Sequence, residues 1–156
     1  RLSPLAQRKA IGRDVLALLD AKKLIASPGT YTRVLRGSNR LSGDLQTLLA
    51  DSTVTCECCA LGAAACALAK CANDVEAKGG WAYDRPTEKR LQAILGIDQT
   101  DLIESAFESW CGDDALLRAF ATAYPDKTDR LRAIYTQVAR TGTFNPAKDP
   151  KVKEAS

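Results

Sequence analysis

The chain has 156 residues, of which 46% are hydrophobic and 26% are charged; this balance is typical of a folded globular protein and excludes wholesale disorder. Its formal net charge of +3 is too small by itself to indicate a polyanionic partner. Histidine is absent, which excludes Ser-His-Asp and Cys-His nucleophile systems, histidine-ligated catalytic zinc and histidine proton shuttles.

The N-terminal third begins with a predicted helix. Ser3 can cap a helix and Pro4 suits its first position, so a helix should run from here to about residue 22. A turn cluster follows at residues 27–29, and residues 31–35 fit either a short extended piece or a turn of helix. A short helix is expected to open at Ser42 or Gly43 and to end near residues 51–53.

The segment from Cys56 to Cys71 is small or apolar on nearly all sides, with charges only at Glu57 and Lys70. A helix of this composition belongs in the interior, because alanine, cysteine and glycine side chains allow neighbouring helices to approach closely. We therefore expect one continuous helix here, with the other helices packed around it.

The C-terminal half predicts four more helices, each with its own start and stop signals. They begin at Pro86 or Thr87, at Asp98 or Thr100, at Asp113 or Asp114, and near Asp126, and they end at Leu95, Trp110, Tyr124 and Gly142. In the second of these helices Ile103, Phe107 and Trp110 form a stripe that should be buried. Three acids, Asp101, Glu104 and Glu108, lie on the opposite face and are expected to be solvated rather than catalytic.

These elements predict an all-α fold, a single-domain bundle of about six helices around the central alanine- and cysteine-rich helix. The domain should cover residues 1–145, followed by a loose polar tail at residues 146–156. No apolar run is long enough to span a bilayer, so we expect no membrane association and a cytoplasmic location.

The six cysteines raise the question of a metal or disulfide site. On a continuous helix Cys59 and Cys66 would be about 10 Å apart, too far for one zinc ion with zinc–sulfur bonds of about 2.3 Å. Reduced, buried thiols without metal or cofactor are therefore expected. A redox role for Cys56, Cys58 or Cys59 stays an alternative, because a helix N-terminus can lower a thiol pKa.

Two features indicate binding surfaces. Trp81, Tyr83 and Arg85 lie in a glycine-opened loop, and these residue types dominate interface hot spots, although Trp81 would equally fit the edge of the core. The first 50 residues carry nine basic side chains against three acidic ones. A basic cluster within them that fits either phosphate contacts or a solvated face comprises Lys22, Lys23, Arg33, Arg36 and Arg40.

Several segments, among them RKAIGRDVLALLDAKKL, CCALGAA and RLRAIYTQVARTGTFNP, resemble small bacteriophage and prophage proteins of uncharacterised function. The resemblance covers most of the chain from Arg8 to Pro146 and carries no catalytic residues. It implies a viral accessory protein that binds a host protein or complex, such as an inhibitor of a CRISPR-type defence complex.

The leading hypothesis is therefore a non-enzymatic, phage-type protein that binds and modulates a host protein through Trp81, Tyr83 and Arg85. The first alternative is a nucleic-acid-binding module that uses the basic N-terminal third. The second is a cysteine-based redox or metal-binding protein.

Overall fold

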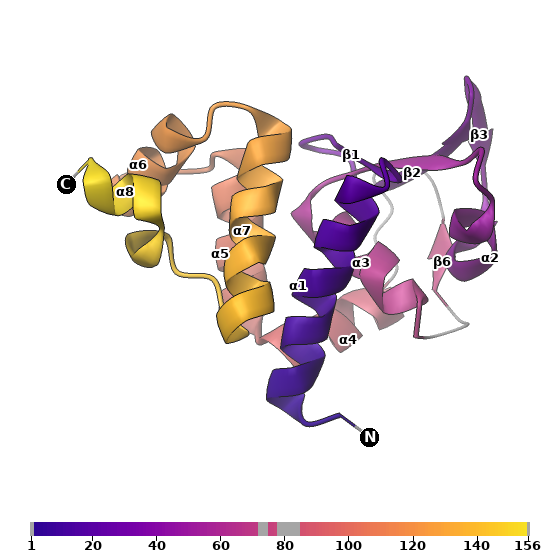
Figure 1. Ribbon diagram of the computed structural model, residues 1–156, viewed down its shortest axis with the longest axis horizontal. Coiled ribbons are helices and arrows are strands. Elements are labelled where there is room, and N and C mark those ends of the chain that lie inside the picture. The colour runs from indigo at the N-terminus through magenta and orange to yellow at the C-terminus, as the bar shows by residue number, and fades with distance from the viewer. Residues whose placement is uncertain (1, 72–74, 78–84, 156) are drawn as a thin grey trace.

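The computed structural model describes residues 2–71, 75–77 and 85–155, and its helices and strands are arranged in two parts along the longest axis (Figure 1). A mixed sheet with its attached helices occupies one end, and a group of C-terminal helices occupies the other. The chain is 62% helical, but 12% of it is in strands, so the fold is α/β and the prediction of an all-α bundle was wrong.

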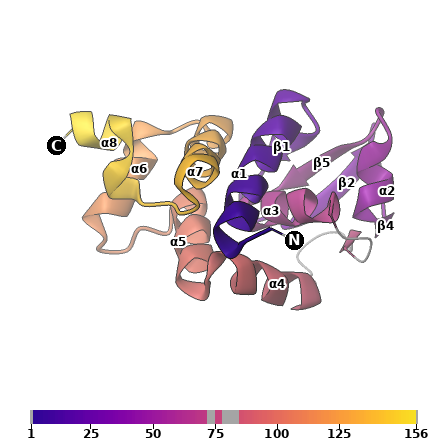
Figure 2. The same ribbon diagram turned by 60° about the horizontal axis from the view of Figure 1, so that its bottom comes forward.

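Two long helices form the seam between these parts. Helix α1 (Pro4–Asp20) begins with the Ser3 side chain accepting from the Ala6 amide, and α7 (Lys127–Thr141) ends at Gly142 in the left-handed conformation. They lie side by side in both views (Figures 1 and 2). Their backbones approach so closely that a Cβ on Gly12 would collide with the backbone of Ala139. Glycine at this position therefore permits the contact.

The four-stranded sheet has the order β1 (Leu24–Ala26), β5 (Thr55–Cys58), β2 (Thr32–Arg36) and β3 (Asn39–Leu41). Strand β5 is parallel to β1 and antiparallel to β2. Cys56 and Cys58 are buried while Thr55 and Glu57 are half-buried, which is the alternation of a strand with one face on the core. The predicted continuous helix from Cys56 was therefore wrong in its first turn.

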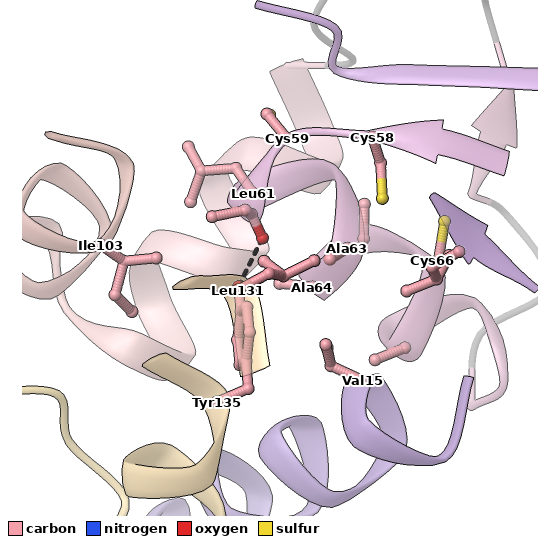
Figure 3. Packing of buried hydrophobic residues seen from close by; sticks show 14 of the residues in the cluster. Val15, Cys58, Cys59, Leu61, Ala63, Ala64, Cys66, Ile103, Leu131 and Tyr135 are labelled. Carbon is pink, nitrogen blue, oxygen red and sulfur yellow. Dashed lines mark hydrogen bonds between the residues drawn. The ribbon is translucent and has the colours of Figure 1, made fainter. Parts of the chain in front are cut away.

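Helix α3 (Ala60–Ala69) follows directly, with Cys59 as its N-cap. Nine of its ten residues are buried, as expected for a central helix. Its N-terminus packs so tightly against the loop before β2 that a Cβ on Gly62 would collide with the Tyr31 carbonyl. Tyr135 of α7 donates a hydrogen bond to the Ala60 carbonyl and so joins α3 to α7 (Figure 3).

The other elements flank this centre. A small two-stranded ladder pairs β4 (Gly43–Asp44) with β6 (Glu76–Ala77), and α2 (Leu45–Ala50) starts from the Asp44 cap. The C-terminal half consists of α4 (Arg85–Leu95), α5 (Ile97–Glu108), α6 (Ala115–Ala123) and α7. Within the described ranges, no helix is long and apolar enough to cross a membrane.

The end of the chain differs from the prediction of a loose tail. Residues 146–148 form a 3₁₀ turn, η1 (Pro146–Lys148), and are followed by a short helix, α8 (Pro150–Glu154). Asp149 and Val152 are almost fully buried, because α8 packs on α6. This C-terminal arm, residues 143–154, lies at the end of the molecule farthest from the sheet (Figures 1 and 2).

Candidate functional site

The aromatic loop predicted as a partner-binding surface is only partly described. Trp81 and Tyr83 lie outside the described residues. Arg85 is the first residue of α4, and its side chain is likewise outside them. This surface stays a prediction.

The basic cluster of the N-terminal third does not form one surface of free cations. Arg33 pairs with Glu57 at 3.5 Å and Arg36 with Asp51 at 2.5 Å. Lys23 donates to the carbonyls of Asp51 and Val54 and so holds the loop before β5. Only Lys22 and Arg40 of this cluster are exposed without a charged partner among the described residues. Most of these cations therefore have structural roles.

Three thiols meet in the core between β5 and α3. Cys56, Cys58 and Cys66 are fully buried, and the sulfur atoms of Cys56 and Cys66 are 3.8 Å apart. The sulfur atoms of Cys58 and Cys66 face one another (Figure 3). Hydrogen bonds from Cys58 and Cys66 lower the pKa of the Cys56 thiol, and the same contacts together with burial raise the pKa values of its two neighbours.

These thiols fill space in the core. No group of three or more histidine, cysteine or acidic residues in the described ranges is arranged to hold a metal ion. None of the six cysteines is disulfide-bonded; Cys71 is exposed and Cys111 half-buried, so the expectation of buried thiols holds only for the other four. Buried thiols without solvent contact are chemically inert in the native state, so the cluster offers no site to an external substrate.

A concave basic surface lies elsewhere, between α7 and the C-terminal arm. Two adjoining hollows of about 400 Å³ and 250 Å³ share Gln137, Arg140 and Lys148 in their walls. We call this surface the C-terminal basic groove, and its basic residues are Arg132 and Arg140 of α7, Lys148 of η1, and Lys151 and Lys153 of α8.

Helix α7 forms one wall of the groove. Arg132, Thr136 and Arg140 follow one another at four-residue intervals, so their side chains share one face of the helix. Gln137 lies beside them, and its Oε1 accepts from the Asn145 amide at 2.8 Å. Its Nε2 is buried and has no acceptor among the described residues.

The C-terminal arm forms the other wall and is held at two points. Gln99 of α5 exchanges two hydrogen bonds with the backbone of Phe144, at 2.7 Å and 2.9 Å. Further along, the Asp149 carboxylate caps α8 by accepting from the amides of Lys151 and Val152. The same carboxylate accepts from the Tyr124 hydroxyl at 2.8 Å. These contacts fix the positions of the arm's lysines relative to α7.

The charge along the groove is uneven. The 250 Å³ hollow is lined by Arg140, Lys148 and Lys153 and by no acidic residue of the described chain. None of these three cations forms an ion pair with a described residue. At the other end Arg132 pairs with Asp20 at 2.8 Å.

The end near Tyr124 is less positive. Asp129 and Asp149 line the larger hollow, and Lys151 lies 4.8 Å from the centre of the Tyr124 ring. Burial, followed by the hydrogen bond to Asp149, raises the pKa of Tyr124, so the hydroxyl stays protonated. The net positive charge is therefore concentrated at the Arg140 end.

A second feature that sequence reasoning missed is Trp110. It was expected in the buried stripe of α5, but it is 60% exposed, whereas Ile103 and Phe107 are buried as predicted. The helix ends at Glu108, and Ser109 turns the chain with a φ of 62°. Arg130 fixes this corner by donating to the carbonyl of Phe107 at 2.8 Å and to the hydroxyl of Ser109 at 2.7 Å.

The acids on α5 also have a different surrounding from the one expected. Glu108 is half-buried and accepts from the Gly29 amide at 2.7 Å, so it joins α5 to the loop before β2. Glu104 is half-buried as well, and of these three acids only Asp101 is exposed. The expectation of one solvated acidic face was therefore right only for Asp101.

The groove has the donors that a phosphate-bearing ligand needs. Guanidinium, ammonium, amide and hydroxyl groups line it, and charge-assisted hydrogen bonds from such groups to phosphate oxygens are among the strongest in proteins. The cations of the groove come from three elements. In the sequence, the groove is indicated only by the spacing of Arg132 and Arg140 and by that of Lys148, Lys151 and Lys153.

Comparison with known proteins adds no family. No protein-family model, no curated protein and no solved structure matches this chain.

Proposed function

We propose that this chain is a binding protein that holds a phosphate-rich polyanion in the C-terminal basic groove. The observation that carries the proposal is the convergence of Arg140, Lys148 and Lys153 on one hollow without an acidic residue in its described lining. Cations that line a concave surface reinforce one another's potential and attract anions more strongly than the same charges on a convex face.

The contrast with the N-terminal cluster supports the choice of site. There the opposite charges of Glu57 and Asp51 offset Arg33 and Arg36. In the groove, desolvating Arg140 or Lys148 breaks no ion pair with a described residue, so the ligand contacts are not offset by a lost intramolecular contact. The alternative of a nucleic-acid-binding module is thus retained, with its contacts moved from the N-terminal third to the C-terminal arm.

The test is calorimetric titration of the protein with inorganic polyphosphate. In Arg140→Ala/Lys148→Ala the affinity should fall at least about tenfold, because each charge-assisted contact contributes about 1.5 to 3 kcal/mol. The matched control is Arg40→Ala/Lys89→Ala, which removes two exposed cations from β3 and α4. It should change the affinity less than about threefold, since distant exposed charges are largely screened. Equal losses in the two variants would refute the groove as the site.

A second candidate function is binding of a partner protein, such as a host protein bound by a phage-type accessory protein. It is favoured by Trp110, because an exposed tryptophan on a fixed corner is the side chain most often found at interface hot spots. The test is affinity capture from host lysate, and Trp110→Ala should lose a specific partner. The control Leu2→Ala changes another exposed apolar residue and should retain that partner. Identical captured proteins for the two variants would exclude this corner as the interface.

A further inference from the structure

We infer that the polyanion is a single-stranded nucleic acid whose backbone runs along α7 through both hollows, an inference that rests on the function proposed above. The groove is elongated rather than a pocket for one compact anion, because the two hollows share Gln137, Arg140 and Lys148. From Arg132 to Arg140 the helix rises about 12 Å. This distance corresponds to about three or four stacked nucleotides at about 3.4 Å each.

The concave shape favours a single strand over a duplex. A duplex is a stiff rod with a persistence length of about 150 base pairs, and proteins contact it by projecting an element into its grooves. Here three cations without an ion pair in the described chain line the walls of a hollow between α7 and the C-terminal arm. A flexible strand can follow such a surface with its phosphates, whereas a rigid duplex reaches only its rim.

The uncharged groups of the groove favour a nucleic acid over a simple phosphate polymer. Gln137, Thr143 and Asn145 line the hollow that holds the three cations. Amide and hydroxyl groups can bond to sugar hydroxyls and base edges, which polyphosphate lacks.

The aromatic contribution to binding should be small, because the Tyr124 ring is already in contact with other groups. Lys151 lies over it at 4.8 Å, and the Phe120 ring packs against it with 5.1 Å between the ring centres. Affinity then depends mainly on phosphate contacts, so it should vary little with base sequence and strongly with salt.

The experiment measures fluorescence anisotropy with three probes: a labelled mixed-sequence single-stranded oligonucleotide, the same strand annealed to its complement, and unlabelled inorganic polyphosphate as competitor. We expect the single strand to bind about tenfold more tightly than the duplex. Arg140→Ala/Lys148→Ala should remove this binding, whereas Arg40→Ala/Lys89→Ala should retain it. In Lys148→Ala alone, the slope of log K against log salt should decrease by about 0.7, the value for one phosphate contact of a single strand.

The outcomes separate the two proposals. If duplex or polyphosphate binds as tightly as the single strand and the groove variant weakens all three, the single-strand inference is refuted and the polyanion groove remains. If no probe responds to the groove variant, both are refuted. As a control, far-UV circular dichroism of every variant should show an intact fold, because the changes are at exposed residues.

Discussion

Asp149 should determine whether the groove exists, because its carboxylate joins the C-terminal arm to the rest of the molecule. It is 2% exposed, caps α8 with two backbone contacts and accepts from the Tyr124 hydroxyl. Asp149→Ala removes the N-cap of α8, which should lower the stability of the arm by about 1 kcal/mol. The charged hydrogen bond with Tyr124 contributes about 1.5 to 3 kcal/mol more, so the arm should lose about 2.5 to 4 kcal/mol in total.

This loss should be local. The arm can detach while the contact of α1 with α7 and the sheet remain, so amide exchange in α8 should accelerate about 70- to 1,000-fold, the factor that corresponds to about 2.5 to 4 kcal/mol. Exchange in β5 should change little. Tyr124→Phe removes only the hydroxyl and retains the cap, so the acceleration should be smaller and correspond to the hydrogen bond alone, at about 1.5 to 3 kcal/mol.

The functional consequence follows from the same geometry. A detached arm no longer holds Lys148 and Lys153 opposite Arg140, so Asp149→Ala should lower polyphosphate affinity although it removes a negative charge. The reasoning would be wrong if α8 exchange stayed within about threefold of the parent, or if exchange in β5 accelerated as much as in α8. An increased affinity would show instead that the carboxylate acts on the ligand only through its charge.

Three further predictions concern the core. Gly62→Ala should lower the free energy of unfolding in urea by about 2 kcal/mol or more, because its Cβ would collide with the Tyr31 carbonyl; an unchanged midpoint would contradict this packing. A thiol reagent should react first with Cys71, then with half-buried Cys111, and with the other four thiols only after unfolding; rapid reaction of all six would contradict the burial. Burial raises the pKa of Cys59 from 9.0 to about 11, so the stability that it contributes is present below pH 9 and lost between about pH 9 and 11. Cys59→Ser retains an N-capping side chain, and in it the free energy of unfolding from denaturant titrations should decrease less between about pH 9 and 11 than in the parent. An equally steep decrease in the variant would show that other groups cause the loss of stability.

The long helices could be predicted because their signals are local. Ser3 with Pro4 sets the start of α1, and Asp126 and Gly142 set the ends of α7, each within one or two residues of the observed boundary. Capping residues act on backbone groups within one turn, so their effect can be inferred without knowledge of the rest of the fold.

The sheet could not be predicted in the same way. Strand β5 consists of Thr55, Cys56, Glu57 and Cys58, and β3, on the other side of β2, is only three residues long, so neither carries a marked alternation of large apolar residues. Their strand conformation comes from pairing with β2, which is more than ten residues away along the chain from β5. Distant backbone pairing therefore overrode the helix predicted for Cys56–Cys58, whereas the small residues that follow are helical.

For this protein, the sequence by itself determined the positions of α1 and α7, the burial of the alanine-rich helix and the amphipathic faces that form the core. Only the tertiary structure decided where the charges act: it paired Arg33 and Arg36 with Glu57 and Asp51, and it brought Lys148 and Lys153 to Arg140. The buried face of a helix can be predicted from the spacing of apolar residues over a few turns of the same helix. The meeting of cations from three elements instead depends on contacts such as Gln99 with Phe144 and Tyr124 with Asp149, whose partners are 45 and 25 residues apart.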